Sequence, residues 1–222
     1  MRRFLTLFAL LCGIGGLAVN PEVTSPARGE PALGVSAAAR AVGFIDVRSA
    51  VPDALIDLRY ATANNFVGVP LYPAGARCLV HESLAGGLAT AAAQLRARGL
   101  RLVFWDCYRP HDVQVRMFEV VSNPAWVARP GDYSKSHESG RSVDVTTYGA
   151  GGLTDMGTDF DSFTPDALAY ATTGVSAAAQ RNRAVLREAM AAGGLSVYDG
   201  EWWHFDGPGA GQPRPIINVP LA

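Results

Sequence analysis

The order of apolar and polar residues predicts a mixture of strands and helices from residue 44 onward. Segments rich in apolar and β-branched residues predict three strands: Leu55–Tyr60, Leu100–Cys107 and Val143–Thr147. Helical periodicity predicts three helices: Glu82–Arg98, Asp112–Val121 and Ala177–Ala192. Leu195–Tyr198 and Trp202–Phe205 predict a hairpin-like pair near the C-terminus. Because helices and strands do not alternate strictly, this pattern favours an α+β fold over a doubly wound sheet.

The N-terminal 43 residues have a different composition from the rest of the chain. Met1-Arg2-Arg3 precedes a charge-free, mostly apolar run, Phe4–Val19, which is too short for a comfortable membrane span and typical of an export signal. We therefore expect residues 1–18 to be a signal peptide, and an uncleaved N-terminal anchor is the alternative. Residues 19–43 are rich in Pro, Gly, Ala and Ser and predict a flexible tether. The folded domain is expected at residues 44–222.

Composition and charge narrow the compartment and the partners. The chain has 222 residues, 49% of them hydrophobic, which suffices for one sizeable core and excludes a disordered protein. Its 19 basic and 20 acidic residues give no electrostatic reason to expect a nucleic acid partner. The signal predicts an exported protein, periplasmic or secreted, without stable membrane association after cleavage. Cys78 and Cys107 would remain in that oxidising compartment, as a disulfide or as two separate buried thiols.

Residues with metal-binding chemistry form two clusters far apart in the sequence. His137 and Asp144 are seven residues apart, and on an uninterrupted strand this odd separation would point them to opposite faces. Gly140 lies between them, and a turn there would let both side chains converge. In the second cluster, Glu201 comes three residues before His204, with two tryptophans between. Two imidazoles and one carboxylate are three ligands of a tetrahedral zinc with an open fourth position, which leaves Glu201 free to act as general base.

The other histidines and the cysteines do not fit a metal site. His81 and His111 have no acid or histidine at a useful spacing, so we expect no ligand role for them. Cys78 and Cys107 do not form the closely spaced pair that a structural zinc finger needs.

Together the two clusters resemble the zinc D-alanyl-D-alanine dipeptidase family. The metal-site pattern is His137-x-x-Gly140-x-x-x-Asp144 followed by Glu201-Trp202-Trp203-His204. Further family landmarks occur in the family's order: Tyr60-Ala61-Thr62-x-x-Asn65-Phe66, Tyr108-Arg109-Pro110, Met156-Gly157-Thr158-x-Phe160-Asp161 and Asn182-Arg183. The resemblance covers residues 44–206, and the co-occurrence is far more specific than any one motif.

The resemblance implies a single α+β domain of the type shared by hedgehog domains and D,D-peptidases, with a mixed or antiparallel sheet and flanking helices. It implies hydrolysis of the small dipeptide D-Ala-D-Ala with one Zn²⁺ per chain. The implied zinc ligands are His137, Asp144 and His204. The other implied roles are Glu201 as the base that passes a proton to the leaving amine, Arg109 at the oxyanion, Asp161 at the substrate's amino group, and Tyr60 and Ser136 in the pocket.

Two departures from the family pattern concern substrate recognition. Lys135, the only lysine of the chain, stands where the family has Ser, and Ser142 stands where Ala is usual. Neither is a predicted ligand, and both departures bear on how the substrate carboxylate is recognised. The alternative functions are a D,D-carboxypeptidase or endopeptidase that acts on peptidoglycan peptides, and a non-catalytic zinc- or peptidoglycan-binding protein. Because Glu201 and Arg109 have no use in a pure binding module, they argue against the non-catalytic alternative.

Overall fold

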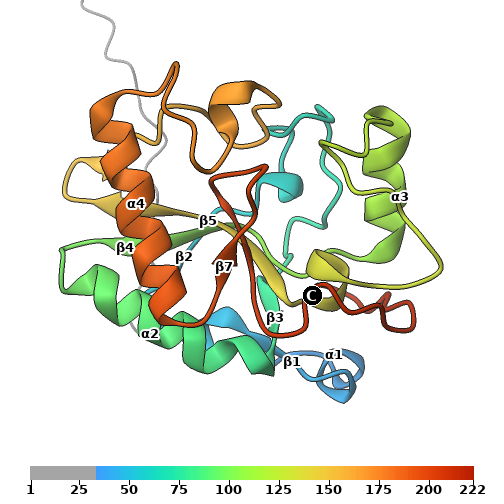
Figure 1. Ribbon diagram of the computed structural model, residues 1–222. Coiled ribbons are helices and arrows are strands. Elements are labelled where there is room, and N and C mark those ends of the chain that lie inside the picture. The colour runs from blue at the N-terminus through green and yellow to red at the C-terminus, as the bar shows by residue number, and fades with distance from the viewer. Residues whose placement is uncertain (1–33) are drawn as a thin grey trace, which may run out of the picture. The chain divides into compact units, whose positions relative to one another are not determined.

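The computed structural model describes residues 34–222, and the expected signal peptide lies outside the described residues. Four α-helices are described: α1 (Ala37–Ala41), α2 (Ala85–Arg96), α3 (His111–Val120) and α4 (Ala177–Ala192). The strands are β1 (Phe44–Asp46), β2 (Leu55–Ile56), β3 (Leu79–His81), β4 (Arg101–Asp106), β5 (Ser142–Gly149), β6 (Gly152–Leu153), β7 (Ser196–Val197) and β8 (His204–Asp206). Short 3₁₀ helices are η1 (Val47–Ser49), η2 (Arg59–Ala61), η3 (Glu82–Leu84), η4 (Ser136–Ser139) and η5 (Pro165–Ala167). Figure 1 shows their arrangement.

Regular structure begins before residue 44, within the segment expected to be a flexible tether. Ser36 caps α1, since its hydroxyl accepts a hydrogen bond of 3.1 Å from the backbone N–H of Ala39. Ala39 is fully buried. The expected tether is therefore too long at its C-terminal end, because a capped turn with a buried alanine belongs to the packed domain.

The main sheet has six strands and is mixed, as an α+β fold predicts. The strand order is β2-β4-β5-β8-β7, and the short β6 pairs with β5. Only the β2–β4 pair is parallel, and the other pairs in this sheet are antiparallel. The expected C-terminal hairpin is confirmed as β7 and β8. A separate antiparallel pair, β1 and β3, lies beside α1 and η3.

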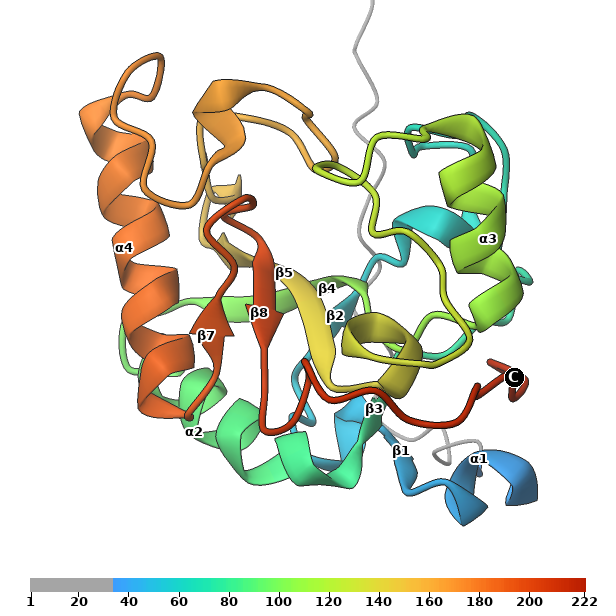
Figure 2. The same cartoon turned by 45° about the vertical axis from the view of Figure 1, so that its right-hand side comes forward.

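Two helices cover one side of the main sheet and a third lies away from them. α2 and α4 pack against each other, and both helices bury aliphatic side chains in the core: Leu88, Ala91, Ala92, Leu95, Leu186, Ala189 and Met190. One part of the core thus lies between the helix pair and the sheet. In Figure 2, α3 and η4 lie on the other side of β5 from this helix pair.

Within residues 34–222, no helix is both long enough and apolar enough to cross a membrane.

A disulfide closes the region next to those strand ends. Cys78 directly precedes β3, and Cys107 directly follows β4. The structure joins the two residues, with Cα atoms 5.2 Å apart, so the alternative of separate thiols is wrong. The bond ties the small β1–β3 sheet to the main sheet at the point where the chain leaves β4.

Candidate active site

Strand register brings together side chains that are distant in the sequence. On β5, Asp144 is the cross-strand partner of His204 on β8 and of Asp106 on β4. Partners directly opposite each other project from the same face of a sheet. Asp106, Asp144 and His204 therefore form one row across three neighbouring strands.

His137 joins this row from η4. The 3₁₀ helix ends at Gly140, whose φ of 64° lies in the left-handed region. A Cβ at this position would also collide with the ring of Phe44, so glycine is required for both reasons. The predicted turn at Gly140 is confirmed, and it lets His137 fold back onto the start of β5.

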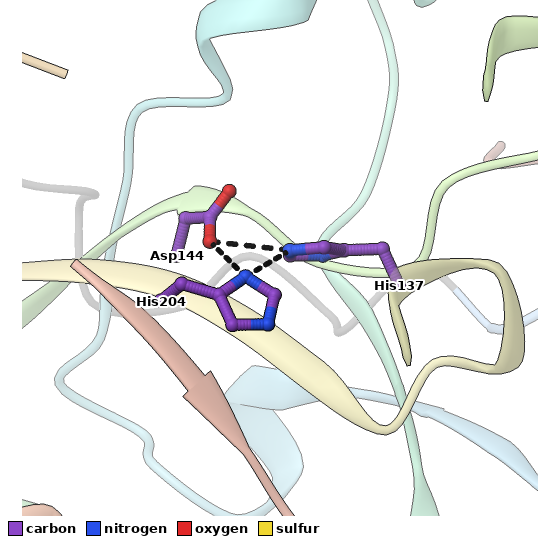
Figure 3. Close-up of side chains that lie close together, drawn as sticks. All are labelled: His137, Asp144 and His204. Atoms are coloured by element: carbon purple, nitrogen blue, oxygen red, sulfur yellow. Dashed lines mark hydrogen bonds and ion pairs between the residues drawn. The ribbon is translucent and has the colours of Figure 1, made fainter. Parts of the chain in front are cut away.

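The donor atoms of the three predicted ligands face one point (Figure 3). His137 Nε2 lies 3.1 Å from Asp144 Oδ1 and 3.0 Å from His204 Nδ1, and the remaining pair is 3.0 Å apart. A tetrahedral zinc with bonds of about 2.0–2.1 Å would hold its ligand atoms about 3.3 Å apart. All three residues are buried. Within the described residues, these three side chains form the cluster that could hold a metal ion.

The outer atoms of both imidazoles are oriented by hydrogen-bond acceptors. His137 Nδ1 lies 2.8 Å from the backbone carbonyl oxygen of Cys107, and His204 Nε2 lies 3.1 Å from Asp206 Oδ1. Each of these nitrogens donates its N–H to its acceptor, which leaves the lone pairs of His137 Nε2 and His204 Nδ1 facing each other. Two lone pairs at 3.0 Å repel unless a proton or a metal ion lies between them.

The electrostatics of the cluster also favour a cation. Burial alone would lower the pKa of His204, but hydrogen bonds to Asp144 and Asp206 raise it well above its ordinary value. Burial opposes ionisation of Asp144, yet His137 and His204 hold the pKa of this carboxyl below its ordinary value. The cluster therefore holds positive charge well, as a metal site must.

Glu201 lies beside the triad without belonging to it. Its Oε2 is 3.9 Å from His204 Nδ1, and burial raises the pKa of its carboxyl to about 7. A carboxylate with a pKa near 7 suits a general base at neutral pH.

Arg109 faces the same point from the loop after β4. Its Nε and Nη2 donate hydrogen bonds of 3.0 and 2.7 Å to Asp106 Oδ2, and its Nη1 donates one of 2.6 Å to Gln114. Its Nη2 is 4.0 Å from Asp144 Oδ2. The guanidinium is therefore a fixed positive group at the edge of the cluster.

The three predicted substrate-binding residues also reach this region. Tyr60 donates a hydrogen bond of 2.9 Å to Asp161 Oδ2, and Arg109 lies over the Tyr60 ring. Burial and the nearby Asp144 raise the pKa of Asp161 well above its ordinary value. Ser136 Oγ lies 3.5 Å from His204 Nε2. Ser136 and Asp161 are the two non-glycine residues with positive φ among those described, at 50° and 56°, and such strain is typical of functional sites.

One cavity of about 320 Å³ contains every predicted site residue except the cysteines. An apolar wall closes one part of it, where Trp126 stacks on Phe163 with ring centroids 5.2 Å apart and Phe66 packs edge-on against Phe163. The cavity is thus large enough to take a small peptide.

Several residues that support the site were not predicted from the sequence. Asp106 and Gln114 hold Arg109, and Gln114 also donates a hydrogen bond of 2.6 Å to the carbonyl of Ala128 in the cavity wall. Of the supporting residues, Asp206 is the one that the sequence could have indicated. It comes two positions after His204, and side chains two positions apart on a strand share a face. His111 lies outside the cluster of the three predicted ligands, and its Nδ1 lies 2.5 Å from Glu138 Oε1.

Two histidines and a carboxylate around one point, with a second carboxylate and an arginine in the same cavity, define the site of a metal-dependent hydrolase. Comparison with known proteins narrows this class. The Peptidase M15 family model, described as D-ala-D-ala dipeptidase, matches residues 40–222. The chain belongs to this family and is a metallopeptidase.

Curated relatives agree with the family. The D-alanyl-D-alanine dipeptidase of Escherichia coli (strain K12) is 35% identical over 168 residues, which cover 75% of this chain and 86% of that protein. The D-alanyl-D-alanine dipeptidase of Enterococcus faecium is 29% identical over 201 residues, covering 81% of this chain and 98% of that protein. The protein of the same name from Enterococcus faecalis is 28% identical over 190 residues, covering 73% of this chain and 90% of that protein.

Proposed function

We propose that this protein hydrolyses the dipeptide D-Ala-D-Ala to two D-alanines, with one zinc ion per chain. The observation that carries the proposal is the convergence of His137, Asp144 and His204 on one point, in a cavity that also holds Glu201 and a buried Asp161. Family membership and the names of the relatives support the substrate.

Zinc fits the donor set because the site offers two imidazole nitrogens and one carboxylate oxygen, which leaves a fourth position open. When bound, zinc supplies a Lewis acid for the peptide carbonyl and lowers the pKa of a water molecule towards about 7. His137, Asp144 and His204 would hold the ion.

Glu201 is the proposed general base. It takes a proton from the attacking water and passes that proton to the amine that leaves when the peptide bond breaks. Burial holds the pKa of Glu201 at about 7, so its carboxyl can both accept and release a proton near neutral pH. Arg109 faces the oxygen that becomes negative, and its hydrogen bonds to Asp106 and Gln114 fix it in advance.

Asp161 is the proposed partner of the substrate's free amino group. Among residues 34–222, it takes part in no ion pair, and its one side-chain hydrogen bond comes from Tyr60. Burial raises its pKa, so this carboxyl favours a cation brought by a ligand. Tyr60 orients Asp161, and Ser136 lines the pocket beside His204.

We further propose that the protein is exported to the periplasm or secreted, and that it serves cell-wall turnover or D-alanine scavenging. The apolar N-terminal run supports export, and the Cys78–Cys107 disulfide suits an oxidising compartment. Destroying D-Ala-D-Ala before its use in wall precursors would need a cytoplasmic enzyme.

The test compares substrates that differ at the amino end. Zinc-loaded protein is assayed for released D-alanine with D-Ala-D-Ala, N-acetyl-D-Ala-D-Ala and a muropeptide that ends in the same two residues. Because acetylation removes the positive charge and leaves the buried Asp161 unpaired, the acetylated and longer substrates are expected to be cleaved at least ~10²-fold more slowly.

Asp161→Ala is expected to narrow that gap, mainly by slowing cleavage of the free dipeptide. Asp159→Ala is the matched control, because Asp159 is an exposed aspartate two residues away. Equal rates on free and blocked substrates would replace the dipeptidase proposal with a D,D-carboxypeptidase that uses the same metal ligands and Glu201.

A further inference from the structure

The cavity contains one half-buried cation without an acidic partner. Lys135, the only lysine in the chain, lines the cavity and directly precedes Ser136 and His137. Its Nζ lies 5.5 Å from the centroid of the Tyr133 ring. In the part of the chain that the structure describes, Lys135 makes no ion pair and no side-chain hydrogen bond.

The other two cations of the cavity differ from Lys135. Arg109 is held by Asp106 and Gln114 and faces the metal cluster. Arg129 is exposed, and its guanidinium lies over the ring of Phe118, a residue of α3 that does not line the cavity. Lys135 is therefore the cation beside the metal ligands that is available to a ligand.

The remaining charge of the cavity is acidic. Five carboxylates line it: Glu138, Asp144, Asp161, Glu201 and Asp206. A dipeptide carries a free carboxylate as well as a free amino group, and because an acidic side chain cannot form an ion pair with that carboxylate, a cation must receive it. Desolvating that carboxylate without a partner would weaken binding further.

Lys135 and Asp161 belong to different segments of the chain. Asp161 lies in the segment between β6 and α4, whereas Lys135 lies directly before η4. Both views show η4 at the start of β5 and the β6–α4 segment towards the far end of that strand (Figures 1 and 2). The metal ligand Asp144 lies near the start of β5. Lys135 and Asp161 thus come to one cavity from two different segments, which offers a peptide with two charged ends a separate partner for each end.

We propose that Lys135 binds the terminal carboxylate of the peptide substrate while Asp161 binds its amino group. This inference rests on the proposed peptidase function and specifies how the substrate is oriented. An ammonium on a flexible stem acts as a point charge rather than a fork, so it attracts the carboxylate without fixing one geometry. The terminal carboxylate keeps its charge throughout the hydrolysis, so a contact with it is made in substrate and transition state alike and the effect falls on KM rather than on kcat.

The experiment compares D-Ala-D-Ala with D-Ala-D-alaninamide, in which a neutral amide replaces the carboxylate. In Lys135→Met, kcat/KM for D-Ala-D-Ala is expected to fall by about 10- to 100-fold, the range for loss of a charged hydrogen bond. The fall should come mainly from KM, and cleavage of the amide should change little. Lys135→Arg should retain a large part of the preference for the carboxylate. Arg129→Gln is the matched control, since it removes one exposed positive charge from the same cavity and should leave the preference unchanged.

Binding separates this inference from the proposed function. Calorimetry on Glu201→Gln protein, with and without Lys135→Met, measures the affinity ratio of the two dipeptides without turnover. A ratio that drops only with Lys135→Met supports the inference even if the rate assay changes the assigned reaction. A ratio that does not change, an equal loss for both dipeptides, or an equal drop in Arg129→Gln overturns it. Zinc content and thermal unfolding of each variant establish that the site is intact.

Discussion

The two histidines of the metal cluster belong to regions that support them in different ways. His137 lies in the η4 turn, and its outer nitrogen bonds to a main-chain group, the Cys107 carbonyl at 2.8 Å. His204 lies at the start of β8, and its outer nitrogen bonds to the side chain of Asp206 at 3.1 Å. Asp206 in turn accepts a hydrogen bond from the Ser142 hydroxyl, which accepts one from Ser136.

This difference determines which support a mutation can remove. A carbonyl oxygen belongs to the main chain whatever side chain the residue carries, and Cys107 directly follows strand β4, whose pairing in the sheet holds the main chain there. A side-chain acceptor disappears when its residue changes. The η4 side of the cluster should therefore tolerate substitution of its supporting residues, and the β8 side should not.

The largest expected effect is loss of the metal from either side. His137→Ala and His204→Ala should each reduce zinc from about one ion per chain to near zero, because two remaining ligands bind zinc poorly. Atomic absorption on dialysed protein measures this, and D-alanine release should fall with the metal. His81→Ala and His111→Ala are the matched controls, since neither histidine belongs to the cluster. Full activity in metal-free protein would remove the zinc from the proposed mechanism.

The next effect separates chemistry from metal binding on the β8 side. Glu201→Gln should keep zinc, because Glu201 Oε2 stands 3.9 Å from His204 Nδ1 and outside the triad. The same substitution should lower kcat by about 10²- to 10⁴-fold, the range for a positioned general base. Steady-state kinetics and zinc content, measured on the same preparation, distinguish a general base from a metal ligand. Loss of zinc would make Glu201 a ligand.

Much of the fold could be predicted because long, strongly patterned segments decide their own structure. The helix expected at Ala177–Ala192 has those bounds, with Ser176 as its N-cap. Leu55–Tyr60 shows where this fails, since only Leu55 and Ile56 form a strand and Arg59–Ala61 form a 3₁₀ helix. β2 is an edge strand paired only with β4, and its length depends on a partner that the local pattern does not specify.

The same division holds in the site. Spacing around Gly140 and the Glu201–His204 cluster predicted four residues that the structure brings together, because few chemistries use these residue types at these distances. Gln114 could not be predicted, since a glutamine on a helix is ordinary until the fold places it against Arg109. The support of His137 by the Cys107 carbonyl could not be predicted from the sequence either, because every residue has a carbonyl.

The smallest expected effect tests whether the η4 and β8 sides of the metal cluster differ in how they are supported. Asp206→Ala should weaken zinc binding by about 10- to 100-fold, the usual result of removing the partner of a metal-bound histidine, and Asp206→Asn by less because it keeps an acceptor oxygen. The double substitution Cys78→Ala/Cys107→Ala removes side chains next to the other histidine but keeps its carbonyl partner. It should cost about 2–4 kcal/mol of folding stability yet leave zinc affinity nearly unchanged. Competition with a chelating dye at fixed pH, under conditions where each variant is folded, measures both affinities. Equal weakening in the two variants would show that the η4 and β8 sides depend on their side chains alike.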